Sequence, residues 1–589
     1  MKNCYNKIVK MLVTGIVLLS FASCSDFLTK KPLTSFTDEF YWTSEASIKN
    51  FAWSLYSSTL IAYGTGTSAD FYWQSESNPM GLSEDMRAAT FLAFPVIAYT
   101  TSSTWSGHYE NIRRANLMLA RIPEMDLSDA VKSHWMAVAR FFRAHRYFSL
   151  VAAWGDVPLI TEFLDPSEKD KMYVPRSSRK EVMNLIISDL QYACTNMNAA
   201  PVSIVNNNNN DNLHRDVAYA FLARVALYEG TFRKYHNLGD YNGYLQMAES
   251  AAKTLIDKPY YGLQSNSYKT KYMSENLAGN KEVIFFKRYV RDVLCHYIQA
   301  HIHSSSPQSF GLTKYAVESY VCKDGLPISQ SPLYQGDHGI ANVRANRDPR
   351  LLDATFDLLA FSGNNYPNSK VNSTTGFAPA MFTDFSKSLT DPEVESENRN
   401  HTDGPLFTIC EAYLIYAEAK AELGTITQND LDISVNLLRR RVGIPDLTLM
   451  GSDVTVNGVI INDPKRTSDL ERATKGGVVS PLLWEIRRER RAEFMAWRLL
   501  RHADLDRWAK GEYLDSRLNP DVMKGAWIEG VPAGSNVATD NPTNNKGPGY
   551  IFLSSIRTFN EKYYLDPVPT TEITLYESKG AKLTQNPGW

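Results

Sequence analysis

Hydrophobic and polar residues follow a helical period in the stretch after Ser128. Ser128 is a suitable N-cap residue, and Asp129 places an acidic group in the first turn, where the positive end of a helix favours it. In Gly155-Asp-Val-Pro158 the pattern stops, because glycine accepts a left-handed conformation and proline holds the preceding residue extended. The stretch therefore predicts a long helix that ends in a tight turn. Its apolar face is expected to hold Val131, Trp135, Val138, Phe142, His145 and Phe148.

Further stretches repeat this period, and few of them are separated by strand-like segments. They predict a mainly α fold, in which tetratricopeptide-like helix hairpins stack into a partial solenoid. The repeat signature itself is degenerate, so the prediction depends on the pairing of helices. The predicted helices cover residues 48–63, 105–121, 179–197, 215–229, 245–256, 411–423, 429–441 and 481–508.

Charged residues are concentrated in the last predicted helix, 481–508. Arg490 and Arg501 lie at steps between the apolar residues of its stripe, so both are expected at a buried face. A buried guanidinium group needs carboxylate or carbonyl partners. We therefore interpret residues 485–493 as a structural ion network and not as a catalytic carboxylate pair.

The helical period fades in two long segments, which sets the predicted boundaries. Residues 258–405 are irregular, with Glu282-Val-Ile-Phe285 as the clearest strand, and residues 511–560 are rich in Gly, Pro and Asn and are expected to be loop. The predicted regions are a signal peptide at 1–23, helices at 24–257, an irregular ligand-binding lobe at 258–405, helical pairs at 406–510 and a loop-rich segment at 511–589.

Composition and charge exclude some classes of partner. Hydrophobic residues make up 43% and charged residues 21% of the chain, which is ordinary for a soluble globular protein. The formal net charge is −2, and loss of residues 1–23, which hold three lysines and no acidic residue, would change it to −5. Proteins that bind nucleic acid concentrate positive charge on one face, so a nucleic-acid partner is not expected.

The start of the chain predicts an exported lipoprotein. Three lysines precede an apolar run at 11–19, which is too short to span a bilayer. The following Phe21-Ala-Ser-Cys24 resembles the site at which bacterial lipoproteins are cleaved and acylated, with Phe21 in place of the usual leucine. We expect lipid attachment at Cys24, since acyl chains on that cysteine would hold the protein at a membrane.

Several blocks of the sequence, in order, resemble the SusD/RagB family of outer-membrane nutrient-uptake lipoproteins. Among them are Gly155-Asp-Val-Pro-Leu159, Tyr416-Ala-Glu-Ala419 and Gln585-Asn-Pro-Gly-Trp589. One block would be weak, but the ordered set is specific and extends over nearly the whole chain. The blocks lie at 24–28, 105–116, 139–160, 174–177, 416–419, 436–443, 485–494, 504–508 and 585–589.

This resemblance implies four tetratricopeptide-like helix pairs that carry an irregular ligand-binding lobe. It also implies a lipid-anchored protein on the outer face of the outer membrane, which covers a SusC-like TonB-dependent transporter and captures oligosaccharides, or peptides in some members. No cofactor is implied. The family blocks mark the scaffold, so no ligand-binding residue is transferred from them.

Candidate ligand-binding residues come from the chemistry of sugars instead. Pyranose rings have flat C–H faces that stack on aromatic side chains, and their hydroxyls need polar groups nearby. Trp73 is the strongest single candidate, because it lies in a polar loop without helical periodicity. The full candidate set is Phe71, Tyr72, Trp73, Tyr289, Tyr297, His303, Tyr315 and Tyr334.

Histidines in the irregular lobe raise the question of a metal. His301 and His303 would face the same side of an extended chain, as paired metal ligands do. Apart from Cys295 beside His296, no carboxylate or cysteine completes the spacing, so we expect a polar hydrogen-bonding surface and no metal.

Three functions remain open from the sequence. The leading hypothesis is a non-catalytic protein that binds oligosaccharide and delivers it to the transporter. A peptide binder of the same architecture would use main-chain hydrogen bonds and charged pockets. A surface glycoside hydrolase would need two carboxylates, and no motif places such a pair.

Overall fold

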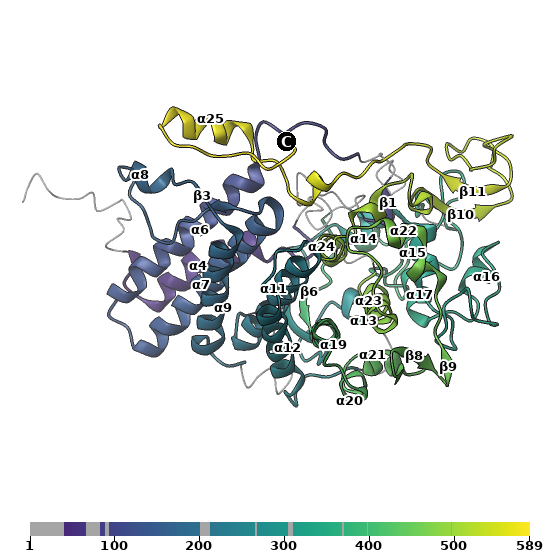
Figure 1. Cartoon of the computed structure of the whole chain (residues 1–589), viewed down its shortest axis with the longest axis horizontal. Helices are drawn as coiled ribbons and strands as arrows, with labels where there is room; N and C mark the ends of the chain where they lie inside the picture. The colour runs from purple at the N-terminus through teal and green to yellow at the C-terminus, as the bar shows by residue number, and fades with distance from the viewer. Residues whose placement is uncertain are drawn as a thin grey trace, which may run out of the picture.

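The computed structural model describes the chain from residue 41 onward, apart from a few short segments. The mainly α fold predicted from the sequence is confirmed, and Figure 1 shows long helices on one side of the molecule and short elements on the other. No helix among the described residues is long and apolar enough to cross a membrane. The described residues are 41–65, 83–88, 93–200, 212–264, 268–303, 310–367, 370–396, 398–495 and 498–589.

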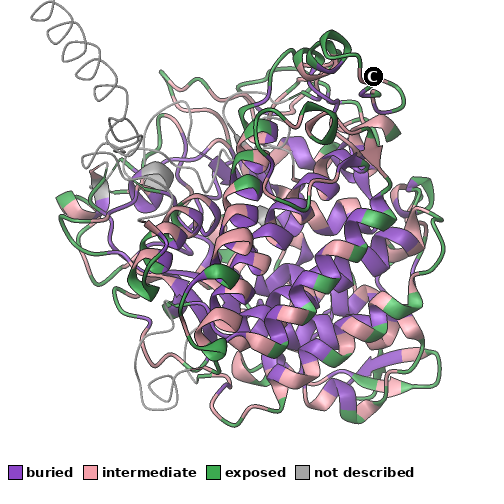
Figure 2. Ribbon diagram, turned by 90° about the vertical axis from the view of Figure 1, so that its left-hand side faces the viewer, coloured by how far each residue is buried: buried purple, intermediate pink, exposed green. Residues whose placement is uncertain are grey.

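The long helices form a stack in which neighbours in sequence are neighbours in space. Contacts run from α6 to α7, from α7 to α9, from α9 to α11, from α11 to α12 and from α12 to α19. Their inward faces are buried, as Figure 2 shows, which is the packing expected of stacked helix hairpins. The helices are α4 (Glu45–Thr59), α6 (Ser103–Arg121), α7 (Asp129–Trp154), α9 (Arg179–Asn196), α11 (Arg215–Tyr235), α12 (Asn242–Ile256) and α19 (Ile409–Leu423).

Two segments that were predicted as single helices each form two helices in the structure, so those two predictions are wrong. Residues 429–441 form α20 (Gln428–Asp432) and α21 (Val435–Arg441), which are separated at Ser434. Residues 481–508 form α23 (Pro481–Glu493) and α24 (Arg498–Arg507).

An ion pair explains the second break. Arg490 Nε lies 2.8 Å from the Asp504 carboxylate. In one straight helix these two residues would be about 21 Å apart along the axis. The buried arginine on α23 therefore reaches its carboxylate only because the chain turns between the two helices.

The remaining elements are short, and every strand pair is antiparallel. The strands are β1 (Met86–Ala88), β2 (Val157–Pro158), β3 (Arg176–Ser177), β4 (Val283–Lys287), β5 (Phe310–Leu312), β6 (Gly404–Thr408), β7 (Thr448–Met450), β8 (Asp453–Val456), β9 (Val459–Ile460), β10 (Lys524–Ile528) and β11 (Gly549–Phe552). The pairs are β1 with β5, β2 with β3, β4 with β6, β7 with β8, β8 with β9 and β10 with β11. The short helices are α8 (Lys169–Met172), α13 (Thr270–Met273), α14 (Ile298–His303), α15 (Lys314–Ser319), α16 (Ile340–Arg344), α17 (Pro349–Ala354), α18 (Pro392–Glu395), α22 (Asp469–Ala473) and α25 (Thr570–Ser578). Five 3-10 turns complete the described elements: η1 (Ile122–Glu124), η2 (Pro464–Thr467), η3 (Gly511–Leu514), η4 (Pro520–Met523) and η5 (Glu561–Tyr564).

The tight turn after α7 is present, and it joins distant parts of the chain. Gly155 ends the helix with φ of +72°, and a Cβ there would meet a Leu565 side-chain carbon at 3.1 Å. The adjacent β2 pairs with β3, and both Arg176 and Asn586 donate hydrogen bonds to the carbonyl of Trp154 at 3.1 Å. Three of the blocks that suggested the family therefore meet at this one turn, which gives them a structural role.

The predicted ion network around α23 is confirmed. Buried Glu493 accepts hydrogen bonds from Lys271 at 2.9 Å and from Arg441 at 2.5 Å. Burial alone would raise the pKa of this carboxyl, but the two cations hold it below its usual range. Glu489, one turn earlier, contacts Arg350 on α17 at 2.5 Å. Charged side chains of α23 thus connect the helical stack to the irregular lobe.

A second group of pairs lies where α24 meets α19. Glu418 accepts hydrogen bonds from Arg507 at 2.6 and 2.8 Å and from the Trp508 indole at 2.7 Å. Burial would raise the pKa of Glu418, but Arg507 and nearby arginines lower it. Such a buried carboxylate is compatible with folding only while its cationic partner is present.

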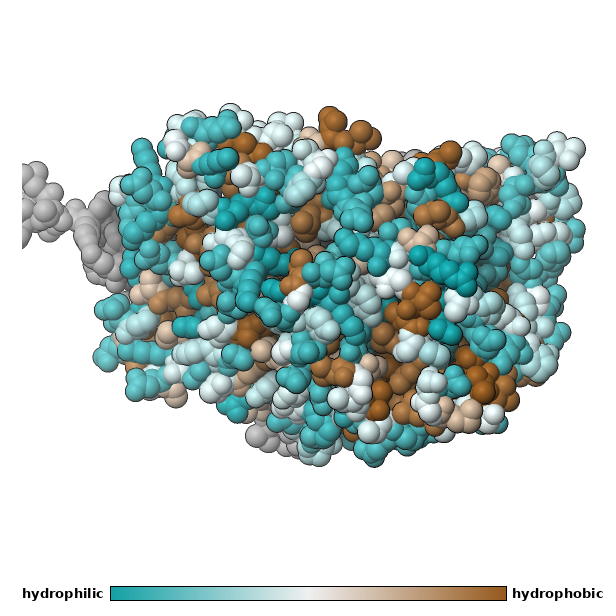
Figure 3. Space-filling view, in the orientation of Figure 1, coloured by the Kyte–Doolittle hydropathy of each residue, from teal (hydrophilic) through white to brown (hydrophobic). Residues whose placement is uncertain are grey.

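Four cysteines fall among the described residues, and all are buried free thiols: Cys194, Cys295, Cys322 and Cys410. The surface of the face in Figure 3 is largely hydrophilic. Its hydrophobic residues are spread over small groups, one of which lies near β8 and β9, where Met450, Val459 and Ile460 are exposed.

Replacing Glu418 tests the buried network. We expect Glu418→Gln to lower the free energy of unfolding by about 3 kcal/mol, because Arg507 loses a buried carboxylate. Urea denaturation followed by circular dichroism measures the change. Glu110→Gln, which alters the exposed Glu110–Arg114 pair, is the control and should cost less than about 0.5 kcal/mol. Equal losses in the two variants would contradict the structural role of the network.

Candidate functional site

The β10–β11 pair places two half-buried aromatic side chains on one face. Trp527 of β10 and Tyr550 of β11 are direct partners across the ladder. Partners of this kind project to the same side of a sheet, with their Cβ atoms roughly 5 Å apart. The hairpin lies at the end of the molecule away from the helical stack (Figure 1).

Tyr334 completes a small cavity with this pair. Tyr334, Trp527 and Tyr550 line a space of about 10 Å³, beside Lys314 and Glu318 of α15. The space is about the size needed for one water molecule. The three rings therefore lie close together, although one of them is about two hundred residues away from the others in sequence.

His338 covers one of these rings. Its imidazole stacks on the Trp527 indole with ring centres 3.9 Å apart and planes 7° from parallel. The side chain of His338 is nevertheless 61% exposed to solvent, so its outer face is open. We refer to Tyr334, His338, Trp527 and Tyr550 as the aromatic cluster.

Charged groups surround the aromatic cluster on several sides. The Tyr550 hydroxyl donates a hydrogen bond to the Asp337 carboxylate at 2.5 Å, and burial together with this carboxylate raises the pKa of Tyr550 above its usual range. The ammonium groups of Lys314 and Lys524 lie 5.2 and 5.5 Å from the Tyr550 ring centre. Burial raises the pKa of Tyr334 to about 12, so both phenols stay neutral near pH 7.

This combination suits a neutral polyhydroxylated ligand. Aromatic faces pack against apolar C–H surface, while carboxylate, hydroxyl and ammonium groups at the rim offer acceptors and donors. The arrangement contains no activated nucleophile. It can bind and orient a ligand, and it supplies no group that would attack one.

A larger cavity, of about 50 Å³, meets a different face of α15. Tyr315 lines it together with Trp484, Trp508 and Tyr513, and with several arginines. Its cations are held by carboxylates, for example Arg491 by Asp85 and Lys510 by Glu471. This cavity therefore belongs to the buried ion network.

The sequence-predicted tyrosines fall in different environments. Tyr334 belongs to the aromatic cluster, whereas Tyr315 is 8% exposed and points into the larger cavity. Tyr289 is 3% exposed, and its hydroxyl donates to the carbonyl of Gly64 at 2.7 Å, so its ring is part of the core. Tyr297 is half-buried against the core. The structure brings only Tyr334 of these four into an aromatic group at the surface.

The histidine prediction depended on an extended chain, and this premise is wrong. His301 and His303 lie in the helix α14 and not on an extended chain. His296 is buried, which lowers its pKa to about 3, and its Nε2 lies 3.0 Å from the carbonyl of Thr402. Neutral His296 thus has a structural role. Phe71, Tyr72, Trp73 and Cys24 lie outside the described residues.

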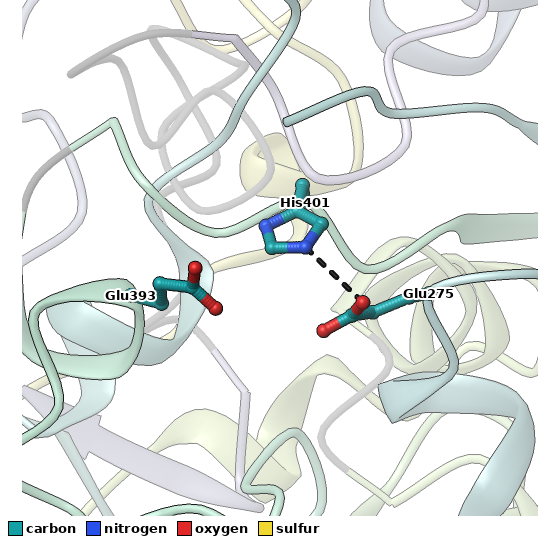
Figure 4. Close-up of side chains that lie close together, drawn as sticks. All are labelled: Glu275, Glu393 and His401. Atoms are coloured by element: carbon teal, nitrogen blue, oxygen red, sulfur yellow. Dashed lines mark ion pairs between the residues drawn. The ribbon is translucent and has the colours of Figure 1, made fainter. Parts of the chain in front are cut away.

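One group of potential metal ligands is present in the described part of the chain. Glu275, Glu393 and His401 place their ligand atoms within 4.8 Å of one another. Figure 4 shows these three side chains close together. The group already contains cations, however. The Lys387 ammonium binds both carboxylates, and the Arg291 guanidinium binds Glu393. A metal would have to displace these cations, so we interpret the group as an ion-pair cluster.

Trp527, Tyr550 and His338 were missed at the level of sequence. The segment 511–560 was expected to be loop, but it contains the hairpin of β10 and β11. A signal was available, because Ala526-Trp-Ile528 and Tyr550-Ile-Phe552 are short apolar runs in a segment rich in turn residues. His338 had no comparable signal, since its partner lies far away in sequence.

Comparisons with known proteins agree with this fold. Residues 255–589 match a family model described as the SusD family, and residues 26–227 match one described as starch-binding associating with outer membrane. A SusD-like protein of Bacteroides ovatus is 30% identical over 202 residues. That match takes in 32% of this chain and 35% of the relative, so it spans about a third of the relative's length.

The matches to solved structures cover nearly the whole chain, whereas the sequence match to the relative covers about a third of it. A SusD-like protein of Bacteroides fragilis superposes with a TM-score of 0.64 at 22% identity, over 95% of this chain and 100% of that one. A SusD-like carbohydrate binding protein of the same species gives 0.65 at 21% identity, over 91% and 99%. At such identities the likeness establishes the fold.

A double-mutant cycle tests the bond that fixes Tyr550 in the aromatic cluster. We expect Tyr550→Phe and Asp337→Ala to be coupled by about 1.5–3 kcal/mol in the free energy of unfolding, because each change removes the bond between a hydroxyl and a charged carboxylate, which contributes in this range. Urea denaturation of both single variants and the double variant gives the coupling. Additive losses would mean that the two side chains do not interact in solution.

Proposed function

The chain belongs to the SusD family, whose model matches residues 255–589, and from this premise we propose that it binds glycans without cleaving them. The aromatic cluster is the observation that carries the proposal for the described residues. It combines a cross-strand tryptophan and tyrosine with Asp337 and two ammonium groups at the rim. Ring faces for stacking and polar groups for hydroxyls are the two requirements of a sugar site.

The buried carboxylate beside the cluster, Glu318, supports binding without hydrolysis. A glycoside hydrolase needs one carboxyl group with a raised pKa to act as the acid. Glu318 is paired with Lys314 and with Lys465. Burial would raise its pKa, but the two lysines lower it, so Glu318 stays ionised. It cannot serve as a proton donor near pH 7.

We further propose that the protein is a lipoprotein of the outer membrane that delivers its glycan to a SusC-like TonB-dependent transporter. The acylation motif ending at Cys24 supports the anchor. The family description of residues 26–227, which names association with the outer membrane, supports the location. In this proposal the extracellular face carries the aromatic cluster, and Phe71, Tyr72 and Trp73 remain candidate glycan-binding residues.

A peptide ligand is the alternative within the same family. It would use main-chain hydrogen bonds and charged pockets more than ring faces. The aromatic cluster favours the glycan, because it is rich in ring faces and the cavity that it lines, of about 10 Å³, has room for about one water molecule and not for a peptide side chain.

Substitution of Trp527 tests glycan binding. We expect Trp527→Ala to weaken binding about two- to tenfold, because one stacked ring contributes about 0.5–1.5 kcal/mol. Calorimetry with starch and a panel of other polysaccharides measures the affinity. Trp53→Ala is the matched control, since Trp53 is a 43% exposed tryptophan on α4, in the helical stack. Binding of peptides but of no polysaccharide would overturn the proposal in favour of the alternative.

Substitution of Cys24 tests the anchor. In the native host we expect the wild-type protein in the membrane fraction, with a mass that shows acylated Cys24, and Cys24→Ser in the soluble fraction. Cys194→Ser, which changes a buried free thiol, should stay in the membrane fraction. A wild-type product with an unmodified thiol at Cys24 would contradict the proposed anchor.

A further inference from the structure

The ring face best suited to a sugar is already occupied by the protein itself. A planar side chain at 3.9 Å and 7° covers the indole of Trp527 as closely as a bound ligand would. The covering side chain is His338, which otherwise projects into solvent. A ligand that stacks on this face must first displace it.

The backbone around His338 is held in place by several contacts. Asp337 accepts the hydrogen bond from Tyr550 at 2.5 Å, and His338 forms a parallel bridge with Trp527. The carbonyl of His338 accepts a hydrogen bond from the Asn342 side chain at 3.0 Å, and Gly339 is the N-cap of α16. These contacts fix the main chain on both sides of the histidine.

The imidazole itself has few restraints. Its described contacts are the stack on Trp527 and a 3.8 Å approach to Asp337, and most of its surface is exposed. The side chain can therefore rotate off the indole while the backbone stays fixed.

We propose that His338 is a side-chain gate of the glycan site: its imidazole covers the Trp527 indole in the free protein and rotates away when a sugar ring takes its place. The inference rests on the proposed function. It makes the apparent affinity for a glycan lower than the intrinsic affinity of the open site, by the fraction of molecules in which the gate is open. His338 is thus a residue that sets affinity, although it makes no contact with the bound sugar.

Two substitutions at the gate predict opposite effects. His338→Ala removes the cover and is expected to tighten glycan binding about two- to tenfold, whereas His338→Phe strengthens the stack and is expected to weaken it. Calorimetry of the full chain with starch, or with the tightest-binding polysaccharide of the panel, gives the affinities of the wild type and of both variants. Gln335→Ala, an exposed change in the same segment, is the control and should leave the affinity unchanged.

A second measurement needs no ligand. Acrylamide quenching of tryptophan fluorescence should rise in His338→Ala relative to wild type, and this rise should vanish when Trp527 is also replaced by Phe. The part of the quenching that depends on Trp527 reports the exposure of its indole. This comparison therefore separates removal of the His338 imidazole from a general change in folding.

The outcomes distinguish the gate from the function. Tighter binding by His338→Ala and weaker binding by His338→Phe support the gate. Weaker binding by His338→Ala and tighter binding by His338→Phe would show that the imidazole is part of the sugar-binding surface, and would overturn the gate. In that case, weaker binding by Trp527→Ala would still support the proposed glycan site. If Trp527→Ala binds as wild type does, the proposed site fails, and the gate fails with it.

Discussion

Buried ion pairs that spread from one helix hold the two parts of the molecule together. Charged residues of α23 reach Lys271 and Arg350 in the irregular lobe, Arg441 on α21 and Asp504 on α24. The irregular lobe consists of short elements, and the apolar clusters within it are small, such as the one around Phe356, Val371 and Ala378. Each of these pairs is costly to desolvate, so the arrangement is stable only if all partners are in position at once. The network therefore specifies one relative position for the lobe and the helical stack.

The aromatic cluster depends on this frame. His338 and Tyr334 precede α16 and α17, and α17 is tied to α23 through Arg350 and Glu489. Lys314 and Glu318 belong to α15, which contacts β10 of the hairpin. The aromatic cluster combines side chains from two distant segments. It keeps its geometry because α17 is held by the Arg350–Glu489 ion pair and the hairpin contacts α15.

The helical stack could be predicted from sequence because its signals are local. The steps of three and four along α7, and the glycine and proline after it, fall within a few residues of one another. The buried arginines of α23 were also predictable, since they interrupt an apolar stripe. The break between α23 and α24 was not, because it follows from the pairing of Arg490 with Asp504 across a turn. Trp527 and His338 become neighbours only through the tertiary fold, so no local pattern could place one ring on the other.

The turn after α7 closes a loop across most of the chain. The carbonyl of Trp154 accepts a hydrogen bond from Asn586, a residue 432 positions later, and the Trp154 indole donates one to the carbonyl of Pro567. Bringing such distant residues together costs loop-closure entropy before their contacts repay it. The end of α7 therefore depends on a segment far away in sequence, and shortening the chain before residue 565 would destabilise a helix that ends hundreds of residues earlier.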